Sequence, residues 1–84
     1  SYPNPFNCST TIEYELSKDS YVVLKIIDFR GREVKTIVDE YQTTGKYSLS
    51  WDGTVNGISQ PSGVYFYQIE TGVLKQTKKM LFLK

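Results

Sequence analysis

Few side chains in this sequence have the types and spacing that chemistry requires. Its 84 residues include no histidine and a single cysteine, Cys8, and its carboxylates are not clustered. A catalytic nucleophile needs a neighbouring base, and a zinc ion needs several Cys or His ligands, so the sequence supports neither kind of centre. The glycines stand singly at turns, which argues against a phosphate-binding loop. We therefore expect no catalytic residue, no metal ion and no cofactor.

Two weaker patterns remain. Asp52 stands close to Asn56, which suggests a calcium loop, but calcium needs several oxygen ligands at closer spacing, and capping of a turn by Asp52 is the better interpretation. Exposed tyrosines can stack on a sugar or a nucleobase, although packing in or around the core explains single tyrosines more simply. The tyrosines considered for such a platform are Tyr2, Tyr41 and either Tyr65 or Tyr67.

Length and charge narrow the classes of protein further. A chain of 84 residues forms one domain, and its formal net charge of +1 draws it neither to nucleic acid nor to an anionic membrane. No apolar run approaches the roughly 18 residues that a membrane span needs, and no secretory signal is present. Because the chain starts at Ser1 without a methionine, we expect it to be a segment of a longer protein. Cys8 alone cannot form an intrachain disulfide.

The pattern of apolar residues predicts a β protein. Side chains of alternating character mark five strand-length segments between turn residues, and the densest run of β-branched and aromatic residues, 62–69, is predicted to be a central strand. A polar excursion over 54–60 should form a tight surface turn. Six or seven short, mainly antiparallel strands in two packed sheets predict an all-β, immunoglobulin-like β-sandwich. The other expected strands are Thr10–Leu16, Tyr21–Phe29, Glu33–Val38, Lys46–Trp51 and about Gln76–Leu83.

One segment has two interpretations. Val34, Ile37 and Val38 have the spacing of a helix face, which fits an irregular strand equally well. We favour the strand, because the segment is rich in β-branched residues, lacks an N-cap and follows Gly31, which suits a hairpin.

Several short motifs are spread over the whole chain: Tyr2–Asn7, Ser9–Ile12, Leu24–Asp28, Gly31–Val34, Trp51–Gly53, Ser62–Tyr67 and Lys78–Lys84. In this order they resemble the C-terminal sorting domain of the type IX secretion system. The same segments are similar to the immunoglobulin-like domain of the flagellar hook-capping protein. Cys8 departs from the pattern, because the family usually has proline there.

The resemblance implies a single domain, residues 1–84, at the C-terminus of a larger exported protein. It implies delivery of the cargo to the periplasm, recognition of the folded domain by the type IX outer-membrane translocon, and removal by a surface protease. The product would be secreted or held at the cell surface. The cargo could be an enzyme, whereas this domain would not be one, and no nucleic acid is involved.

We expect recognition to involve the last strand, because it is basic and accessible. Lysines on an edge strand also discourage unwanted sheet pairing, and a homodimer through such an edge or through Cys8 stays open. The hypothesis adds a Gly63-Val64-Tyr65 edge as a second contact, by charge complementarity or strand addition. At least two of the four apolar residues 80–83 should be core. The candidate recognition residues are Gly63, Val64, Tyr65, Lys78, Lys79, Met80, Leu81, Phe82, Leu83 and Lys84.

Two other functions stay open. The first is a structural accessory module that acts as a spacer or in assembly. The second is a carbohydrate-binding module of a secreted glycosidase, which would depend on exposed tyrosines.

Overall fold

The computed structural model describes residues 10–83, and these form eight strands and no helix. No helix in this part of the chain therefore has the length and apolar character that crossing a membrane requires. The predicted all-β class is confirmed. Four of the five strand segments predicted outside the polar turn and the central run appear within one residue of their expected bounds, and the fifth, Glu33–Val38, continues to Gln42. The strands are β1 (Thr10–Leu16), β2 (Ser20–Asp28), β3 (Glu33–Gln42), β4 (Gly45–Trp51), β5 (Thr54–Val55), β6 (Ile58–Ser59), β7 (Gly63–Glu70) and β8 (Lys75–Phe82).

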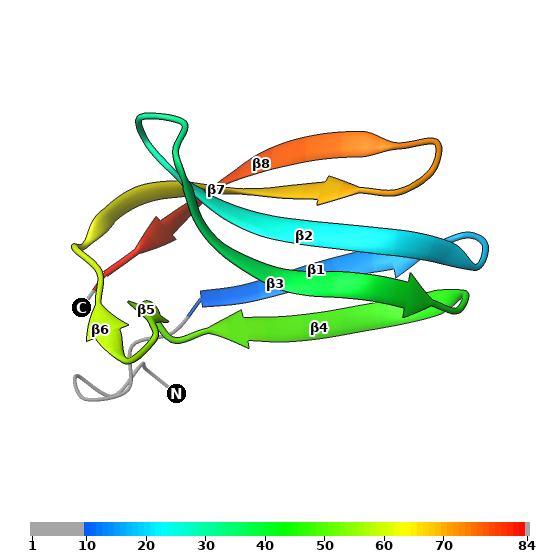
Figure 1. Cartoon of the computed structure of the whole chain (residues 1–84), viewed down its shortest axis with the longest axis horizontal. Helices are drawn as coiled ribbons and strands as arrows, with labels where there is room; N and C mark the ends of the chain where they lie inside the picture. The colour runs from blue at the N-terminus through cyan, green and yellow to red at the C-terminus, as the bar shows by residue number, and fades with distance from the viewer. Residues whose placement is uncertain (1–9, 84) are drawn as a thin grey trace.

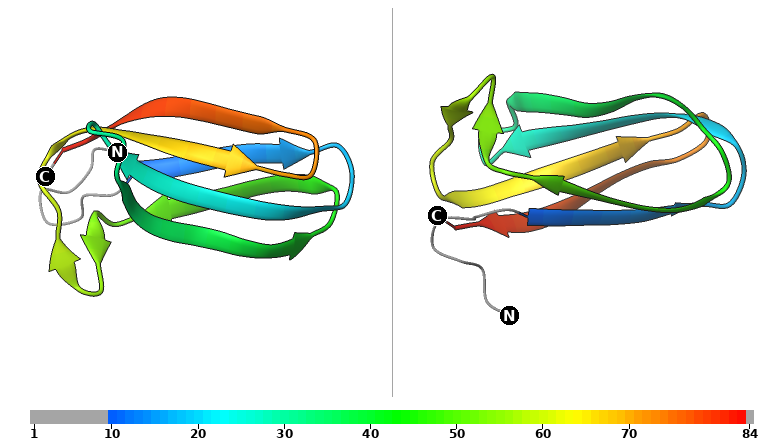
Figure 2. Two further views of the ribbon diagram at one scale, coloured as in Figure 1. Left: turned by 45° about the horizontal axis from the view of Figure 1, so that its top comes forward. Right: turned by 90° about the horizontal axis from the view of Figure 1, so that it is seen from below.

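The strands form two layers. One is a four-stranded antiparallel sheet in the order β3-β2-β7-β8, and the other is the antiparallel pair β1-β4 (Figure 1). The pair covers one face of the larger sheet (Figure 2), so the arrangement is a sandwich with unequal halves. The predicted central strand, β7, lies in the interior of the larger sheet, between β2 and β8. The short β5-β6 hairpin occupies the polar segment 54–60.

The two ends of the sandwich differ. At one end the β1-β2, β3-β4 and β7-β8 turns lie together, and we call it the turn end (right in Figure 1). At the other end β8 finishes next to the start of β1, beside the β5-β6 hairpin. We call this the β8 end.

Alternation along the strands builds the core. Val22, Leu24 and Ile26 of β2 have no exposed surface, whereas the side chains between them lie on the outer face and are partly exposed. This is the period of two that a strand imposes on its side chains. The other layer contributes Ile12 and Leu16 from β1, both buried. The remaining buried apolar residues are Val38, Trp51, Tyr65, Ile69, Met80 and Phe82.

Strand β3 is irregular, which explains its helix-like spacing of apolar residues. Its register against β2 slips twice, between Leu24 and Lys25 and between Ile26 and Ile27. The residues left without a partner on β2 are Ile37 and Val34, and both pack against the core. Two β-bulges therefore turn neighbouring apolar side chains to the same face, as an unbroken strand could not. The strand interpretation of this segment is confirmed.

The turn end of the core contains a buried polar side chain that has hydrogen-bond partners. Gln42 at the end of β3 is buried, and its Oε1 accepts a 2.5 Å hydrogen bond from the Tyr14 hydroxyl. Its amide nitrogen donates to Glu40 at 3.0 Å. The Tyr14 ring also stacks on Tyr47, with 5.1 Å between ring centroids. Burial raises the pKa of Tyr14, although the bond to Gln42 works in the other direction.

Candidate functional site

The last strand divides its side chains between core and solvent. In β8, which pairs with β7, Met80 and Phe82 point inward and are 9% and 2% exposed. Leu81 between them lies on the outer face and is 58% exposed, and Leu83 just beyond the strand is 63% exposed. The expectation that at least two of the apolar residues 80–83 belong to the core is confirmed. The other two leave large apolar side chains in water.

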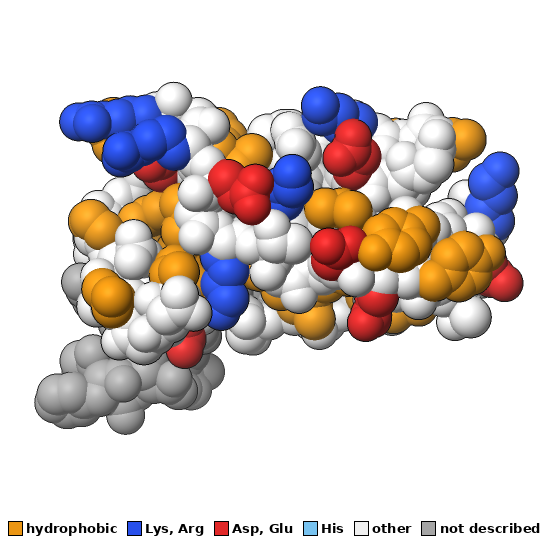
Figure 3. Space-filling view, in the orientation of Figure 1, with side chains coloured by type: hydrophobic (Ala, Val, Ile, Leu, Met, Phe, Trp, Pro, Cys, Tyr) orange, Lys and Arg blue, Asp and Glu red, His pale blue; other side chains and the backbone are white. Residues whose placement is uncertain are grey.

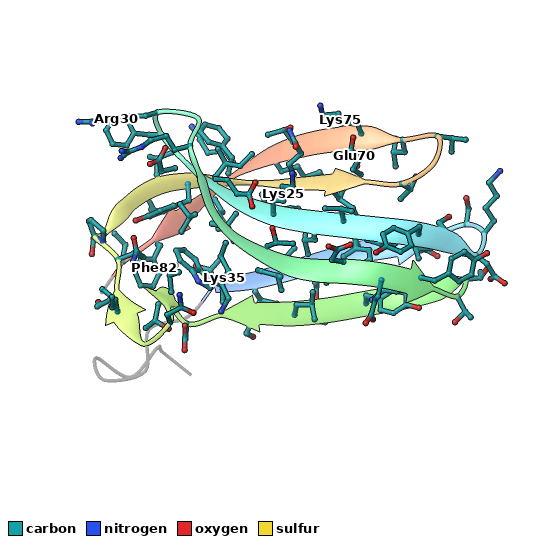
Figure 4. All side chains as sticks on the ribbon, viewed as in Figure 1. Lys25, Arg30, Lys35, Glu70, Lys75 and Phe82 are labelled. Carbon is teal, nitrogen blue, oxygen red and sulfur yellow. The ribbon has the colours of Figure 1, made fainter. Side chains whose placement is uncertain are left out.

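Phe82 completes an aromatic cluster at the β8 end of the sandwich (Figure 4). Its ring centroid lies 5.3 Å from that of Trp51 and 6.2 Å from that of Tyr65. Trp51 and Tyr65 meet edge to face at 5.1 Å, one of the geometries that aromatic pairs prefer. The ring of Phe82 also covers Gly53, where even a single added carbon would lie 2.0 Å from the ring atom Cζ.

The turn after β4 holds this cluster in place. The indole Nε1 of Trp51 donates to the Thr54 carbonyl at 3.0 Å. The Asp52 carboxylate accepts from the Thr54 amide at 2.9 Å and from its hydroxyl at 2.8 Å. The hydroxyl bond first, and then the amide bond, lower the pKa of Asp52. Asp52 therefore caps a turn, and residues 10–83 contain no group of three or more Cys, Asp or Glu side chains that could hold a metal ion.

The lysines of β8 are unpaired within the part of the chain that the structure describes. Lys75, Lys78 and Lys79 are all exposed, and the ion pairs among residues 10–83 involve other residues, Lys25 with Glu33 and Arg32 with Asp28. Lys79 lies on the outer face, whereas Lys78 lies on the same face of the strand as Met80. Lys78 faces a groove between β8 and β1.

Strand β8 is an edge strand, as the sequence predicts, and its free edge meets β1 at one point. The Thr10 hydroxyl donates to the Leu81 carbonyl at 3.3 Å. The Leu81 carbonyl therefore points away from β7. Since peptide groups of an antiparallel strand alternate between its two neighbours, those of Lys79, Thr77 and Lys75 also face the free edge.

A family model with the description "Secretion system C-terminal sorting domain" matches residues 1–83. The chain belongs to this family of sorting domains. Membership indicates a C-terminal sorting signal for type IX secretion, so the protein is secreted or attached to the cell surface through that system. It also indicates that the sorting domain is the C-terminal part of a cargo protein and interacts with the secretion machinery. The resemblance seen in the sequence motifs is confirmed.

A solved structure supports the fold. FlgD from P. aeruginosa matches with a TM-score of 0.68 and 24% sequence identity, over 88% of this chain and 61% of that chain. At this identity the likeness shows the fold alone, which is immunoglobulin-like as predicted. The sorting domain spans about three fifths of the FlgD chain. No curated protein sequence matches the chain.

The fold of the sorting domain brings three family motifs together. Trp51–Gly53 comes from the turn after β4, Ser62–Tyr67 from β7 and Lys78–Leu83 from β8, and all three meet around the ring of Phe82. The motifs were visible in the sequence, but their convergence depends on the pairing of β7 with β8 and on the packing of β4's end against both. Lys84, Tyr2 and Cys8 lie outside the described residues.

The expectation that Gly63, Val64 and Tyr65 form a sheet edge is wrong. Gly63, Val64 and Tyr65 lie in β7, which has β2 and β8 as neighbours, so they do not form a sheet edge. Tyr65 is buried, and its hydroxyl donates to the Pro61 carbonyl at 2.6 Å. Burial raises its pKa, with a smaller contribution from the charge of Asp28. Val64 is 38% exposed and lies opposite Leu81, so it extends the outer apolar surface of β8.

The tyrosines considered for a stacking platform have different environments. Tyr65 is in the core and Tyr67 is packed against it, whereas Tyr41 is 65% exposed. Sequence reasoning missed Tyr21, which lies directly opposite Tyr41 and is 51% exposed. The alternation of β2 could have identified it. Because Val22, Leu24 and Ile26 point inward, Tyr21 must point outward.

Proposed function

We propose that the type IX outer-membrane machinery recognises the folded sorting domain through a recognition strip on the outer face of the sheet, where β8 ends beside the start of β7. The strip consists of Val64, Lys79, Leu81 and Leu83. The observation that carries the proposal is the alternation in β8, which buries Met80 and Phe82 and leaves Leu81 and Leu83 exposed. A signal that must work on different cargo proteins needs such a surface on a self-contained fold.

The strip has the chemistry of a binding surface. Burying one exposed leucine against a partner contributes about 1.5–3 kcal/mol. Lys79 has no carboxylate within 4.0 Å among residues 10–83, so its charge is available to an acidic partner. Met80, Phe82 and Tyr65 lie under the strip and hold it in place, and Gly63 starts the strand that supports it.

Contact through the face of β8 fits the structure better than addition of a strand to its edge. In the half of β8 nearest the turn end, the inward-facing side chains are Gln76 and Lys78, which pair with Ile69 and Tyr67. Inward-pointing charged side chains on an edge strand oppose pairing with another sheet, because the added strand would have to cover them. The same feature opposes a homodimer through this edge.

The wider function that we propose rests on membership of the sorting-domain family. The cargo lies upstream of the sorting domain and crosses the outer membrane through the translocon, and a surface protease then removes the domain. The domain contributes recognition only and no catalysis.

The strip can be tested with variants that leave the core intact. A reporter with the Leu81→Asp or Leu83→Asp domain should reach the medium or cell surface at about one tenth of the wild-type level or less, because a buried leucine contact worth more than 1.4 kcal/mol is lost. The amount of exported reporter would be measured by immunoblotting in a bacterium with a working type IX system.

Thr77→Asp is the matched control, because Thr77 is also exposed on the outer face of β8 but lies outside the strip. It should leave export unchanged, and all three variants should unfold at wild-type temperatures. Normal export of both leucine variants would rule out the strip.

A further inference from the structure

A second surface lies at the turn end of the same sheet, away from the recognition strip. Tyr21 and Tyr41 lie directly opposite each other on β2 and β3, and they are 51% and 65% exposed. Figure 3 shows hydrophobic side chains over this end of the two strands, with acidic side chains beside them. Neither ring belongs to the core. Two aromatic rings in water are thus not explained by packing.

One ring of the tyrosine pair, that of Tyr21, is held by a hydrogen bond. The Tyr21 hydroxyl donates a 2.5 Å hydrogen bond to Asp39 on the neighbouring strand. This bond is the largest cause of a raised pKa of Tyr21, and the negative charges of Asp39 and Glu40 also raise it. The surroundings of the pair are therefore electronegative, and the Tyr21 ring is fixed without a ligand.

Two carboxylates border the tyrosine pair. Val23 follows Tyr21 on the same face of β2, and it has Asp39 opposite on β3 and Glu70 opposite on β7. Neither carboxylate has a basic group within 4.0 Å in the region that the structure describes. Lys75 is paired in register with Glu70 (Figure 4), but their charged groups are farther apart than this limit. Both acids are thus available to a cation.

The surface is hollowed beside the rings. A hollow of about 300 Å³ lies between the tyrosine pair and the β1-β2 and β7-β8 turns. Its walls include Ser20 and Val73 and one charge of each sign, Lys18 and Asp19, so the excess of negative charge at this surface comes from Asp39 and Glu70. Val73 is 80% exposed, so the hollow is open to a chain segment that approaches from solvent.

We propose that Tyr21, Tyr41, Asp39 and Glu70 form a docking surface for an extended peptide segment of a partner protein that carries arginine or lysine. A guanidinium or ammonium group over a tyrosine face is attracted by the ring, and a carboxylate next to the ring adds a charged hydrogen bond. A neutral sugar would also stack on the rings, but it would leave both carboxylates without counter-charge. Charge complementarity therefore selects the basic peptide. The proposal is independent of the recognition strip.

The test is an NMR titration of the chain with a blocked peptide of alternating glycine and arginine at low and high salt. The ring signals of Tyr21 and Tyr41 should shift, and binding should weaken with added salt, because screening acts on exposed charges. Tyr41→Ala and Asp39→Asn should each weaken binding by about tenfold, which corresponds to 1.4 kcal/mol.

Phe29→Ala is the matched control, because Phe29 is 69% exposed but lies in the β2-β3 turn at the other end of the sandwich. It should bind the peptide like the wild type. Absent shifts at low salt, or equal binding by the Tyr41→Ala chain, would overturn the proposal. A neutral oligosaccharide that shifts these signals when the arginine peptide does not would also overturn it, in favour of a glycan site.

Discussion

Replacing Phe82 by alanine is expected to remove a large part of the stability of the sorting domain. Phe82 is 2% exposed and contacts the rings of Trp51 and Tyr65 and the backbone of Gly53. Deleting a buried phenylalanine ring typically costs about 3–5 kcal/mol, because apolar burial is lost and a cavity remains. A chain of this length has a total stability of roughly 4–13 kcal/mol. Urea unfolding followed by tryptophan fluorescence would measure the loss through Trp51.

The neighbouring Leu81→Ala change provides the control for Phe82. Leu81 lies on the same strand and is 58% exposed, so its truncation should cost about 0.5 kcal/mol or less. Equal losses for the two changes would show that Phe82 is not part of the core. A deletion of residues 81–84 would be a poor test of recognition. It removes the core residue Phe82 together with Leu81 and Leu83 of the strip.

Replacing Gly53 by alanine should be nearly as damaging. Gly53 has a φ of +80°, where an L-residue costs about 1–2 kcal/mol. The added methyl group would also lie 2.0 Å from Cζ of Phe82, and that ring is enclosed by Trp51 and Tyr65. Overpacking adds about 1–3 kcal/mol. The same urea experiment should therefore show a loss of about 2–5 kcal/mol.

Gly57 separates the two contributions to the Gly53 effect. Its φ is +79°, but no atom lies within 4 Å of an added methyl group. Gly57→Ala should show the backbone cost alone, so the difference between the two variants measures the clash with Phe82. If both substitutions cost the same, the close packing of Phe82 on Gly53 is contradicted.

The strands were predictable because their side chains alternate. Ile12 and Leu16 on β1, and Val22, Leu24 and Ile26 on β2, have a clear period of two, and all are buried. The full length of β3 was not predicted, because its last residues, Asp39 to Gln42, are mostly polar and read as a loop. They are in the strand because β2 pairs with them, up to Ser20 opposite Gln42.

The candidate site was predictable in part. Alternation predicts that β8 has an inner and an outer face, and the lysines predict that it is an edge. It does not predict that Phe82 covers Gly53, because that contact joins residues 29 positions apart through the packing of two layers. The error about Gly63 to Tyr65 has a similar cause, since the order of strands within a sheet is a property of the whole fold.

If this domain is a sufficient sorting signal, it should direct the export of an unrelated reporter protein. The reporter would carry an N-terminal secretory signal and residues 1–84 at its C-terminus, and it would be expressed in a bacterium with a type IX system and in its translocon mutant. We expect reporter in the medium or on the surface of the first strain and periplasmic reporter in the mutant. Periplasmic retention in both strains, with the domain folded, would contradict this expectation and favour a structural accessory role.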